Sequence, residues 1–114
     1  MANYNRYTSN AKSQSYGGRG YHSKAEAKYA EHLDDLYNRG EIKSWKPQKR
    51  IELFGENGGK VCNYYIDFEV IHHDGTTEFI EVKGFETAIW NLKWKLFKDK
   101  YGHNHKYKIT LEKV

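Results

Sequence analysis

Two acidic residues and a lysine are spaced along the middle of this chain so that they could meet at one point. Asp67 lies in the extended run Tyr65-Ile66-Asp67-Phe68, and Glu81 and Lys83 follow in Glu81-Val82-Lys83. Alternate side chains of a strand share a face, so Glu81 and Lys83 point the same way. Carboxylate oxygens are the ligands that Mg²⁺ prefers, and an ammonium group stabilises charge developing on a phosphate. The pattern therefore indicates metal-dependent cleavage of phosphodiesters.

The turn between these two segments decides how the carboxylates face each other. The turn sequence His72-His73-Asp74-Gly75-Thr76 contains Asp-Gly, a strong hairpin signal. A two-residue loop would set Asp67 opposite Val82, whereas a three-residue loop with left-handed Gly75 sets Asp67 opposite Glu81. We expect the second register, because it keeps the apolar face whole. Facing carboxylates destabilise a plain sheet unless a divalent cation lies between them, and the alternative is two ordinary acidic residues on a solvent face.

Residues 23–39 are predicted to form a helix that ends at Gly40. Its apolar residues form one arc at helical spacing: Tyr29, Ala30, Leu33, Leu36 and Tyr37. Glu26 lies at the edge of that arc, and a carboxylate that faces inward needs a partner. Ser23 and Glu26 also fit a capping box, in which Glu26 turns back to the Ser23 amide. The sequence leaves both interpretations open.

The other segments complete a single domain of mixed α and β structure. Extended segments are expected at 41–45 and 48–54, split by Pro47, followed by a turn at 55–59 and the hairpin at 61–83. A second helix at 86–101 and a strand at 106–112 follow. The order helix, three strands, helix, strand predicts one central sheet flanked by helices.

The second helix carries a lysine on the border of its apolar side. Its predicted buried arc consists of Ile89, Leu92, Leu96 and Phe97. Lys93 projects between Ile89 and Phe97, where it either snorkels to water or reaches a phosphate beside the metal. Trp90 and Trp94 are core residues, a dimer contact or a platform for bases, and the sequence does not decide between these roles.

The N-terminal segment carries the positive charge of the chain. Residues 1–25 contain four basic and no acidic residues, and these account for the whole formal net charge of +4. The basic residues are Arg6, Lys12, Arg19 and Lys24. Residues 1–20 are predicted to form a mobile basic arm whose tyrosines suit contact with nucleic acid, and residues 21–114 to form the domain. The alternative is a solubilising tail.

Cysteine and histidine content argues against other classes of site. Cys62 is the only cysteine, so an internal disulfide is excluded, and the histidines lack the spacing of a structural zinc site. The polar N-terminus has no apolar signal and no spanning segment, so we expect a cytoplasmic protein without membrane contact.

The motifs together resemble the PD-(D/E)XK nuclease superfamily, and within it a group of small phage proteins related to Holliday-junction resolvases. The resemblance covers Tyr21 to the C-terminus. It is carried by Ser23-Lys24-Ala25-Glu26, Tyr65-Ile66-Asp67-Phe68, Glu81-Val82-Lys83-Gly84 and Leu92-Lys93-Trp94-Lys95-Leu96-Phe97. Ile66 departs from the pattern, since it stands where the superfamily name has proline.

The resemblance implies a restriction-endonuclease-like αβββαβ core and a DNA endonuclease that uses Mg²⁺ or Mn²⁺. Asp67 and Glu81 would ligate the metal, Glu26 would complete its shell, and Lys83 would orient the attacking water. Gln48 matches a polar position of some members. DNA contacts would then come from Arg6, Lys12, Arg19, Lys24, Gln48 and Lys93. Branched DNA is a possible substrate, and cutting a junction twice would need a homodimer with two-fold symmetry, in the host cytoplasm if the protein is phage-encoded.

A nucleic-acid-binding or inhibitory module that keeps the nuclease fold without turnover is the alternative. A basic arm rich in tyrosine serves binding as well as cleavage, so composition does not separate the two classes. The joint presence of Glu26, Asp67, Glu81 and Lys83 favours the enzyme, because a pure binder would not require them.

Overall fold

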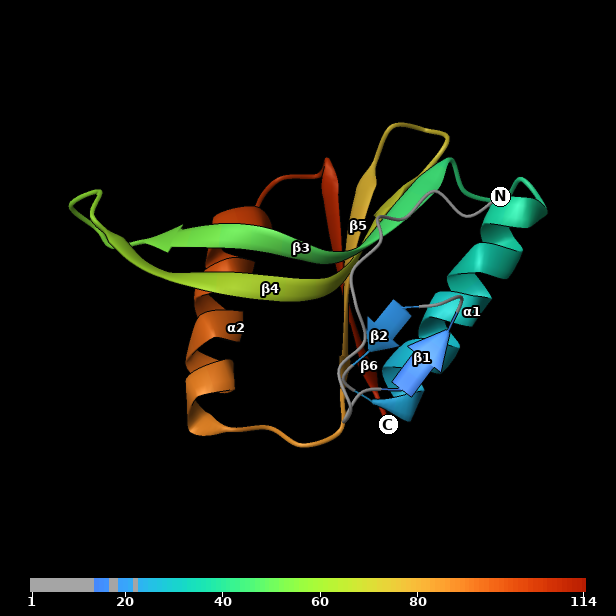
Figure 1. Cartoon of the computed structure of the whole chain (residues 1–114). Coiled ribbons are helices and arrows are strands. Elements are labelled where there is room, and N and C mark those ends of the chain that lie inside the picture. The colour runs from blue at the N-terminus through green and yellow to red at the C-terminus, as the bar shows by residue number, and fades with distance from the viewer. Residues whose placement is uncertain (1–13, 17–18, 22) are drawn as a thin grey trace.

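The computed structural model describes residues 14–16, 19–21 and 23–114 (Figure 1). Two short strands, β1 (Gln14–Tyr16) and β2 (Arg19–Tyr21), pair with each other and precede the helix α1 (Lys24–Asn38). The remaining elements are β3 (Ser44–Phe54), β4 (Lys60–Ile71), β5 (Thr77–Lys83), α2 (Ala88–Tyr101) and β6 (Tyr107–Lys113). From α1 onward, the order is the predicted one.

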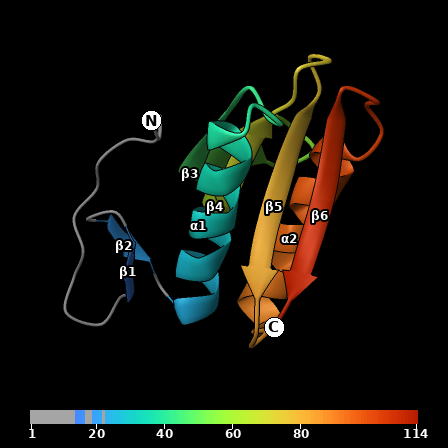
Figure 2. The same cartoon turned by 90° about the vertical axis from the view of Figure 1, so that its right-hand side faces the viewer.

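The four long strands form one mixed sheet in the order β3-β4-β5-β6. Its first three strands are antiparallel, and β6 joins β5 in parallel after the crossover helix α2. The helix α1 covers one face of the sheet and α2 covers the other (Figures 1 and 2). The predicted mixed α and β domain with helices flanking one sheet is therefore confirmed. No helix among the described residues is long and apolar enough to span a membrane.

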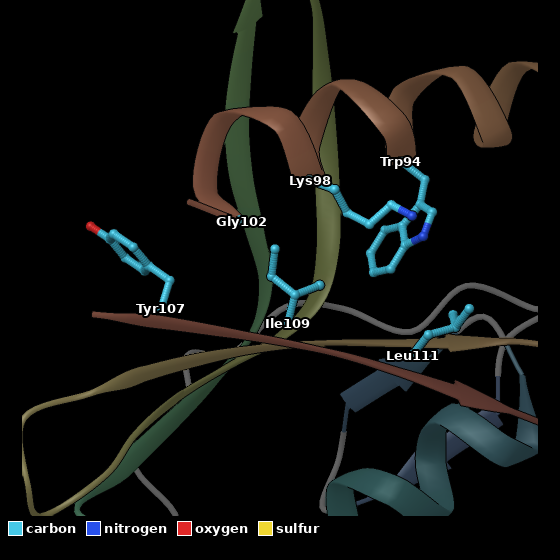
Figure 3. A pocket seen from close by; sticks show the side chains of 6 residues that line it. All are labelled: Trp94, Lys98, Gly102, Tyr107, Ile109 and Leu111. Carbon is cyan, nitrogen blue, oxygen red and sulfur yellow. The ribbon is translucent and has the colours of Figure 1, made fainter. Parts of the chain in front are cut away.

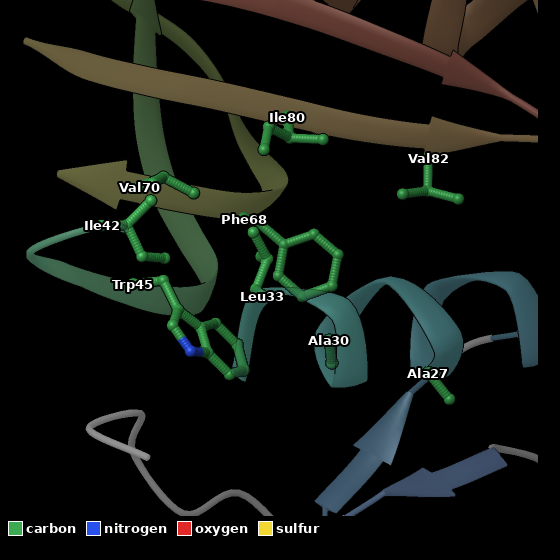
Figure 4. Packing of buried hydrophobic residues seen from close by; sticks show 9 residues of the cluster. All are labelled: Ala27, Ala30, Leu33, Ile42, Trp45, Phe68, Val70, Ile80 and Val82. Carbon is green, nitrogen blue, oxygen red and sulfur yellow. The ribbon is translucent and has the colours of Figure 1, made fainter. Parts of the chain in front are cut away.

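Two hydrophobic clusters fill the space between the sheet and its helices. The cluster under α1, shown in Figure 4, consists of Ala27, Ala30, Leu33, Ile42, Trp45, Phe68, Val70, Ile80 and Val82. The cluster under α2 consists of Ile51, Leu53, Tyr64, Ile66, Phe79, Trp90, Trp94 and Phe97. Neighbouring residues of β5 serve opposite clusters, as Phe79 and Ile80 do, because alternate side chains of a strand point to opposite faces. Residues 79–82 of β5 are consequently buried on both faces of the sheet, and they include one charged residue, Glu81.

The β4–β5 hairpin has the predicted register. Phe68 pairs with Ile80, and Ile71 pairs with Thr77 next to the turn. Gly75 takes a φ of 91°, a left-handed conformation that glycine adopts without steric cost, and its N–H donates to His72 O at 3.0 Å. The ladder ends at Phe68 and Ile80. One step beyond this pair in the same register lie Asp67 and Glu81.

The long β3–β4 hairpin changes direction at Asp67. In a regular strand, the alternate residues Tyr64, Ile66, Phe68 and Val70 would all lie on one face. Here Tyr64 and Ile66 belong to the cluster under α2, whereas Phe68 and Val70 belong to the cluster under α1. The pairing of the two strands skips one position here, between Pro47–Phe68 and Lys49–Ile66. Gln48, at the skipped position, has a φ of 56°. The bend places Asp67 at the junction of the two cores.

Two predictions about β3 were wrong. The strand runs without a break from Ser44 and pairs at Pro47, where the sequence predicted two separate pieces. Because β3 is an edge strand, the missing N–H of Pro47 costs no bond in the interior of the sheet. The irregularity falls one residue later, at Gln48.

The predicted buried arc of α2 was also wrong. Ile89 and Leu92 are 69% and 60% exposed, whereas Trp90, Trp94 and Phe97 are buried. Two overlapping apolar arcs share Phe97, and the arc with the indoles faces the sheet because burying large aromatic rings removes more apolar area from water. Trp90 and Trp94 are thus core residues.

Candidate active site

Three acidic side chains are the buried charged groups of the part of the chain that the structure describes. Glu26, Asp67 and Glu81 are 3%, 7% and 3% exposed. They come from three elements, α1, β4 and β5. Burial of a carboxylate without compensation is costly, so acidic residues are rarely found fully buried unless they are paired or bind a cation. These are the three residues that the resemblance to PD-(D/E)XK nucleases implies as metal ligands.

Asp67 is held by the backbone of the neighbouring strand. Its Oδ2 accepts a hydrogen bond from Val82 N at 2.8 Å, in a position where β4 and β5 no longer pair. Burial, followed by the charges of Glu81 and Glu26, raises the pKa of Asp67 to about 9, although the Val82 amide and Lys83 act in the opposite direction. The Asp67 carboxyl therefore lies within electrostatic range of both other acidic groups.

Glu81 is oriented by an indole and an ammonium group. Its Oε2 accepts a hydrogen bond from Trp90 Nε1 at 3.0 Å and lies 3.8 Å from Lys83 Nζ. Lys83 Nζ also lies 4.9 Å from the centre of the Trp90 ring, within the range of a cation–π contact. Burial raises the pKa of Glu81, whereas Tyr64, Lys83 and Trp90 lower it.

The second carboxylate oxygen of Glu81 takes part in neither of these contacts. Oε1 is buried and has no hydrogen-bond partner among the described residues, and the same is true of the nearby Tyr64 hydroxyl. The two groups are close enough that the Tyr64 hydroxyl lowers the pKa of Glu81, yet they make no well-formed hydrogen bond. Burial and the Glu81 charge raise the pKa of Tyr64. A buried unpaired acceptor in a folded protein calls for an explanation, and a cation is one.

Glu26 faces inward and binds the edge strand. Its Oε2 accepts a hydrogen bond from Gln48 Nε2 at 2.9 Å. At the same time, Ser23 caps the helix, since its Oγ accepts from Glu26 N at 3.1 Å. Ser23 therefore provides its half of the predicted capping box, while the carboxylate of Glu26 points to the interior. Gln48 is brought to the site by its left-handed backbone, a conformation that costs a non-glycine residue about 1–2 kcal/mol.

The other predicted contact residues are not among the buried residues of this centre, or they lie outside the described residues. Lys24 is exposed at the first residue of α1, and Lys93 is half-buried on α2. Arg6 and Lys12 lie outside the described residues, and only the backbone of Arg19 is described, in β2. Sequence reasoning missed Trp90 as a partner of Glu81. Trp90 is the first aromatic residue of the helix that follows Glu81 and Lys83, but helical spacing allowed two buried arcs, so the sequence carried no decisive signal for this contact.

The donor chemistry of the site suits a hard divalent cation. Three carboxyl groups are buried here, Glu81 makes the ion pair with Lys83, and its Oε1 has no hydrogen-bond partner among the described residues. Within the described residues, no three His, Cys, Asp or Glu side chains are already arranged around a single metal position. Mg²⁺ does not require such a cage, because it is commonly held by one or two carboxylates and keeps several waters. The residues present therefore fit Mg²⁺ or Mn²⁺.

The fold and this site define a mixed α and β protein with a buried acidic centre where β4 and β5 diverge. The chain belongs to the family described as "Protein of unknown function (DUF1064)", whose model matches residues 5–113. The match contains all the residues of the centre and reaches into the N-terminal segment. No curated protein and no solved structure gave a significant match.

Proposed function

We propose that this protein is a metal-dependent endonuclease that hydrolyses phosphodiester bonds in DNA. The observation that carries the proposal is the buried centre of Glu26, Asp67 and Glu81 beside Lys83, in which Glu81 Oε1 has no hydrogen-bond partner among the residues that the structure describes. The segments that carry the resemblance to PD-(D/E)XK nucleases include the same four residues, so the resemblance supports the same conclusion.

Glu26, Asp67 and Glu81 would hold Mg²⁺ or Mn²⁺. When bound, the cation lowers the pKa of water and stabilises negative charge on a phosphate oxygen. The raised pKa values of Asp67 and Glu81 favour their protonated forms when no cation is bound. A cation between the carboxyl groups would favour their ionised forms instead. The acidic centre is thus suited to bind a metal and to release protons as it does so.

Lys83 would orient the attacking water and stabilise charge on the scissile phosphate. Its ammonium group is held by Glu81 Oε2 and the Trp90 ring, and the side chain is 23% exposed. A half-buried ammonium with a fixed position acts on developing charge more strongly than a mobile one in water, because water screens it less. Trp90 and Gln48 would position the carboxylates without touching the substrate.

One end of the molecule is suited to receive a phosphate backbone. The N-termini of α1 and α2 lie at the same end as Lys83, the last residue of β5 (Figures 1 and 2). Backbone N–H groups at helix N-termini favour anions. Lys24 is exposed at this end, and Phe85, in the loop after Lys83, is 81% exposed. An exposed aromatic ring beside the centre would stack on unpaired bases, which favours branched or locally single-stranded DNA.

The test is cleavage of three DNA substrates by the purified protein. Supercoiled plasmid, linear duplex and a synthetic four-way junction would each be incubated with Mg²⁺, Mn²⁺ or EDTA. We expect cleavage that depends on the metal and is lost in Asp67→Asn but kept in Asp99→Asn, a control at an exposed position on α2. Binding of DNA without cleavage of any substrate would favour the non-catalytic module instead.

A further inference from the structure

The two edges of the central sheet differ in how open they are to further pairing. β3 contains Pro47, skips a pairing position at Gln48, where the backbone is left-handed, and has a second irregularity between Leu53 and Phe54. β6, by contrast, pairs with β5 at every one of its seven residues without a register shift. Among the described strands, β5 is its one neighbour, and β6 lies at the outer side of the sheet (Figure 2). A regular edge strand is a template for another strand.

The odd-numbered residues of β6 present their backbone groups at this edge. Val114 N donates to Lys83 O, and Lys106 O accepts from Thr77 N, so even-numbered positions point to β5. N–H and C=O groups alternate in direction along a strand. Those of Tyr107, Ile109, Leu111 and Lys113 therefore face outward.

The sequence of β6 is complementary to itself in one antiparallel register. Full overlap of the strand with its own copy centres the pairing on Thr110, because β6 runs from Tyr107 to Lys113. This register sets Lys108 opposite Glu112 of the second copy, and both side chains are exposed. Their backbone groups point to β5, so they form a non-hydrogen-bonded pair, the kind in which opposite side chains lie closest. Two opposite-charge pairs result from the symmetry.

The face of β6 toward α2 would be covered by the same pairing. Ile109 is set opposite Leu111 of the second copy, and both residues are only half-buried in the single chain. They line an open cavity of about 470 Å³ between α2 and β6, together with Trp94, Lys98, Gly102 and Tyr107 (Figure 3). Apolar side chains of a second copy beside this cavity would bury the apolar residues that line it.

We infer that a second copy of this chain docks antiparallel along β6, about a two-fold axis at Thr110. The two four-stranded sheets then become one continuous sheet, and the outward N–H and C=O groups of β6 bond to those of the copy. The interface is self-complementary, as a two-fold dimer requires. The regular edge of β6, the Lys108–Glu112 pairs and the cavity beside α2 support this dimer independently of the nuclease proposal.

The test is an exchange of charge between Lys108 and Glu112. Lys108→Glu places two acidic residues opposite each other in the homodimer, and Glu112→Lys places two lysines there. We expect dimerisation of each single variant to be about tenfold weaker than that of the wild type, since both symmetric pairs become repulsive. The double variant Lys108→Glu/Glu112→Lys should dimerise like the wild type, and the two single variants should form a heterodimer when mixed.

Sedimentation equilibrium and native mass spectrometry measure these associations without DNA, and thermal melting checks that each variant folds. A wild-type protein that stays monomeric at every accessible concentration would overturn the inference. So would a dimer that neither single variant weakens, or single variants that do not recover on mixing. None of these results depends on whether the protein cuts DNA, so failure of this interface and failure of the nuclease proposal are separate outcomes.

Discussion

Trp90 donates its indole N–H to Glu81 Oε2 at 3.0 Å, from α2, the helix that follows the strand carrying Glu81 after a four-residue loop (residues 84–87). This bond fixes the direction of the carboxylate, so that Oε2 faces the indole and Lys83, while Oε1 has no hydrogen-bond partner in the described part of the chain. A core residue thereby orients a candidate ligand. Outer partners of this kind commonly influence metal affinity nearly as much as the ligands do.

Trp90→Phe should separate this role from packing. The variant keeps an aromatic ring but loses the donor, so Glu81 Oε2 keeps only its ion pair with Lys83, and the unfolding free energy should fall by about 1–3 kcal/mol in EDTA. Affinity for Mn²⁺ should fall about tenfold or more. Trp94→Phe is the control, because Trp94 is equally buried and stacks on Trp90. Equal losses of Mn²⁺ affinity in both variants would contradict the positioning role.

Lys83→Ala should abolish cleavage and leave DNA binding nearly intact. A group that acts on charge in the transition state contributes little to binding of the ground state. Lys95→Ala, at an exposed position on α2, provides the control for the loss of one positive charge. Cleavage rates and fluorescence anisotropy with a labelled junction measure the two effects. Normal cleavage by Lys83→Ala would show that its assigned role is wrong.

The pKa of Asp67 predicts how stability depends on pH in the metal-free protein. The folded chain keeps this proton up to about pH 9, whereas the unfolded chain loses it above about pH 3.8. Between these values the folded state binds more protons, so the contribution of Asp67 to stability falls as pH rises. Asp67→Asn removes this dependence, and its advantage over the wild type in urea unfolding with EDTA should grow up to about pH 9. Parallel pH profiles of the two proteins would contradict the assignment.

Gln48 combines a strained backbone with a contact to Glu26, and two substitutions distinguish these features. Gln48→Gly and Gln48→Ala both remove the amide that donates to Glu26. Only glycine accepts a φ of 56° without strain, so the glycine variant should be about 1 kcal/mol more stable in chemical unfolding. Metal affinity should fall in both. A more stable alanine variant would show that the strained backbone does not persist.

Strand periodicity and turn chemistry were enough to predict the centre of the site. The alternation around Asp67 and Glu81 and the single left-handed position at Gly75 fix one register, which the Phe68–Ile80 pair confirms. The sequence left two roles open for Glu26, a helix cap and an inward carboxylate. The structure shows that its backbone N–H donates to the Ser23 cap while its carboxylate faces the interior.

What the sequence did not reveal depends on contacts between distant segments. Helical spacing alone allowed either apolar arc of α2 to be buried. The β3–β4 hairpin that packs against α2 decides between them. The conformation of Gln48 arises because β4 bends at Asp67, and neither residue type predicts it. Trp90 could be recognised as a partner of Glu81 only after the crossover placed the start of α2 beside β5.

The central claim is that Glu26, Asp67 and Glu81 bind a divalent cation, and calorimetric titration with Mn²⁺ tests it most directly. Wild-type protein would be titrated alone and with DNA, beside Glu81→Gln and Glu56→Gln, the latter an exposed position in the β3–β4 turn. The account predicts saturable binding in the wild type and Glu56→Gln, with release of protons to the buffer, and loss of binding in Glu81→Gln. Absence of binding with and without DNA, or unchanged affinity in Glu81→Gln, would contradict it.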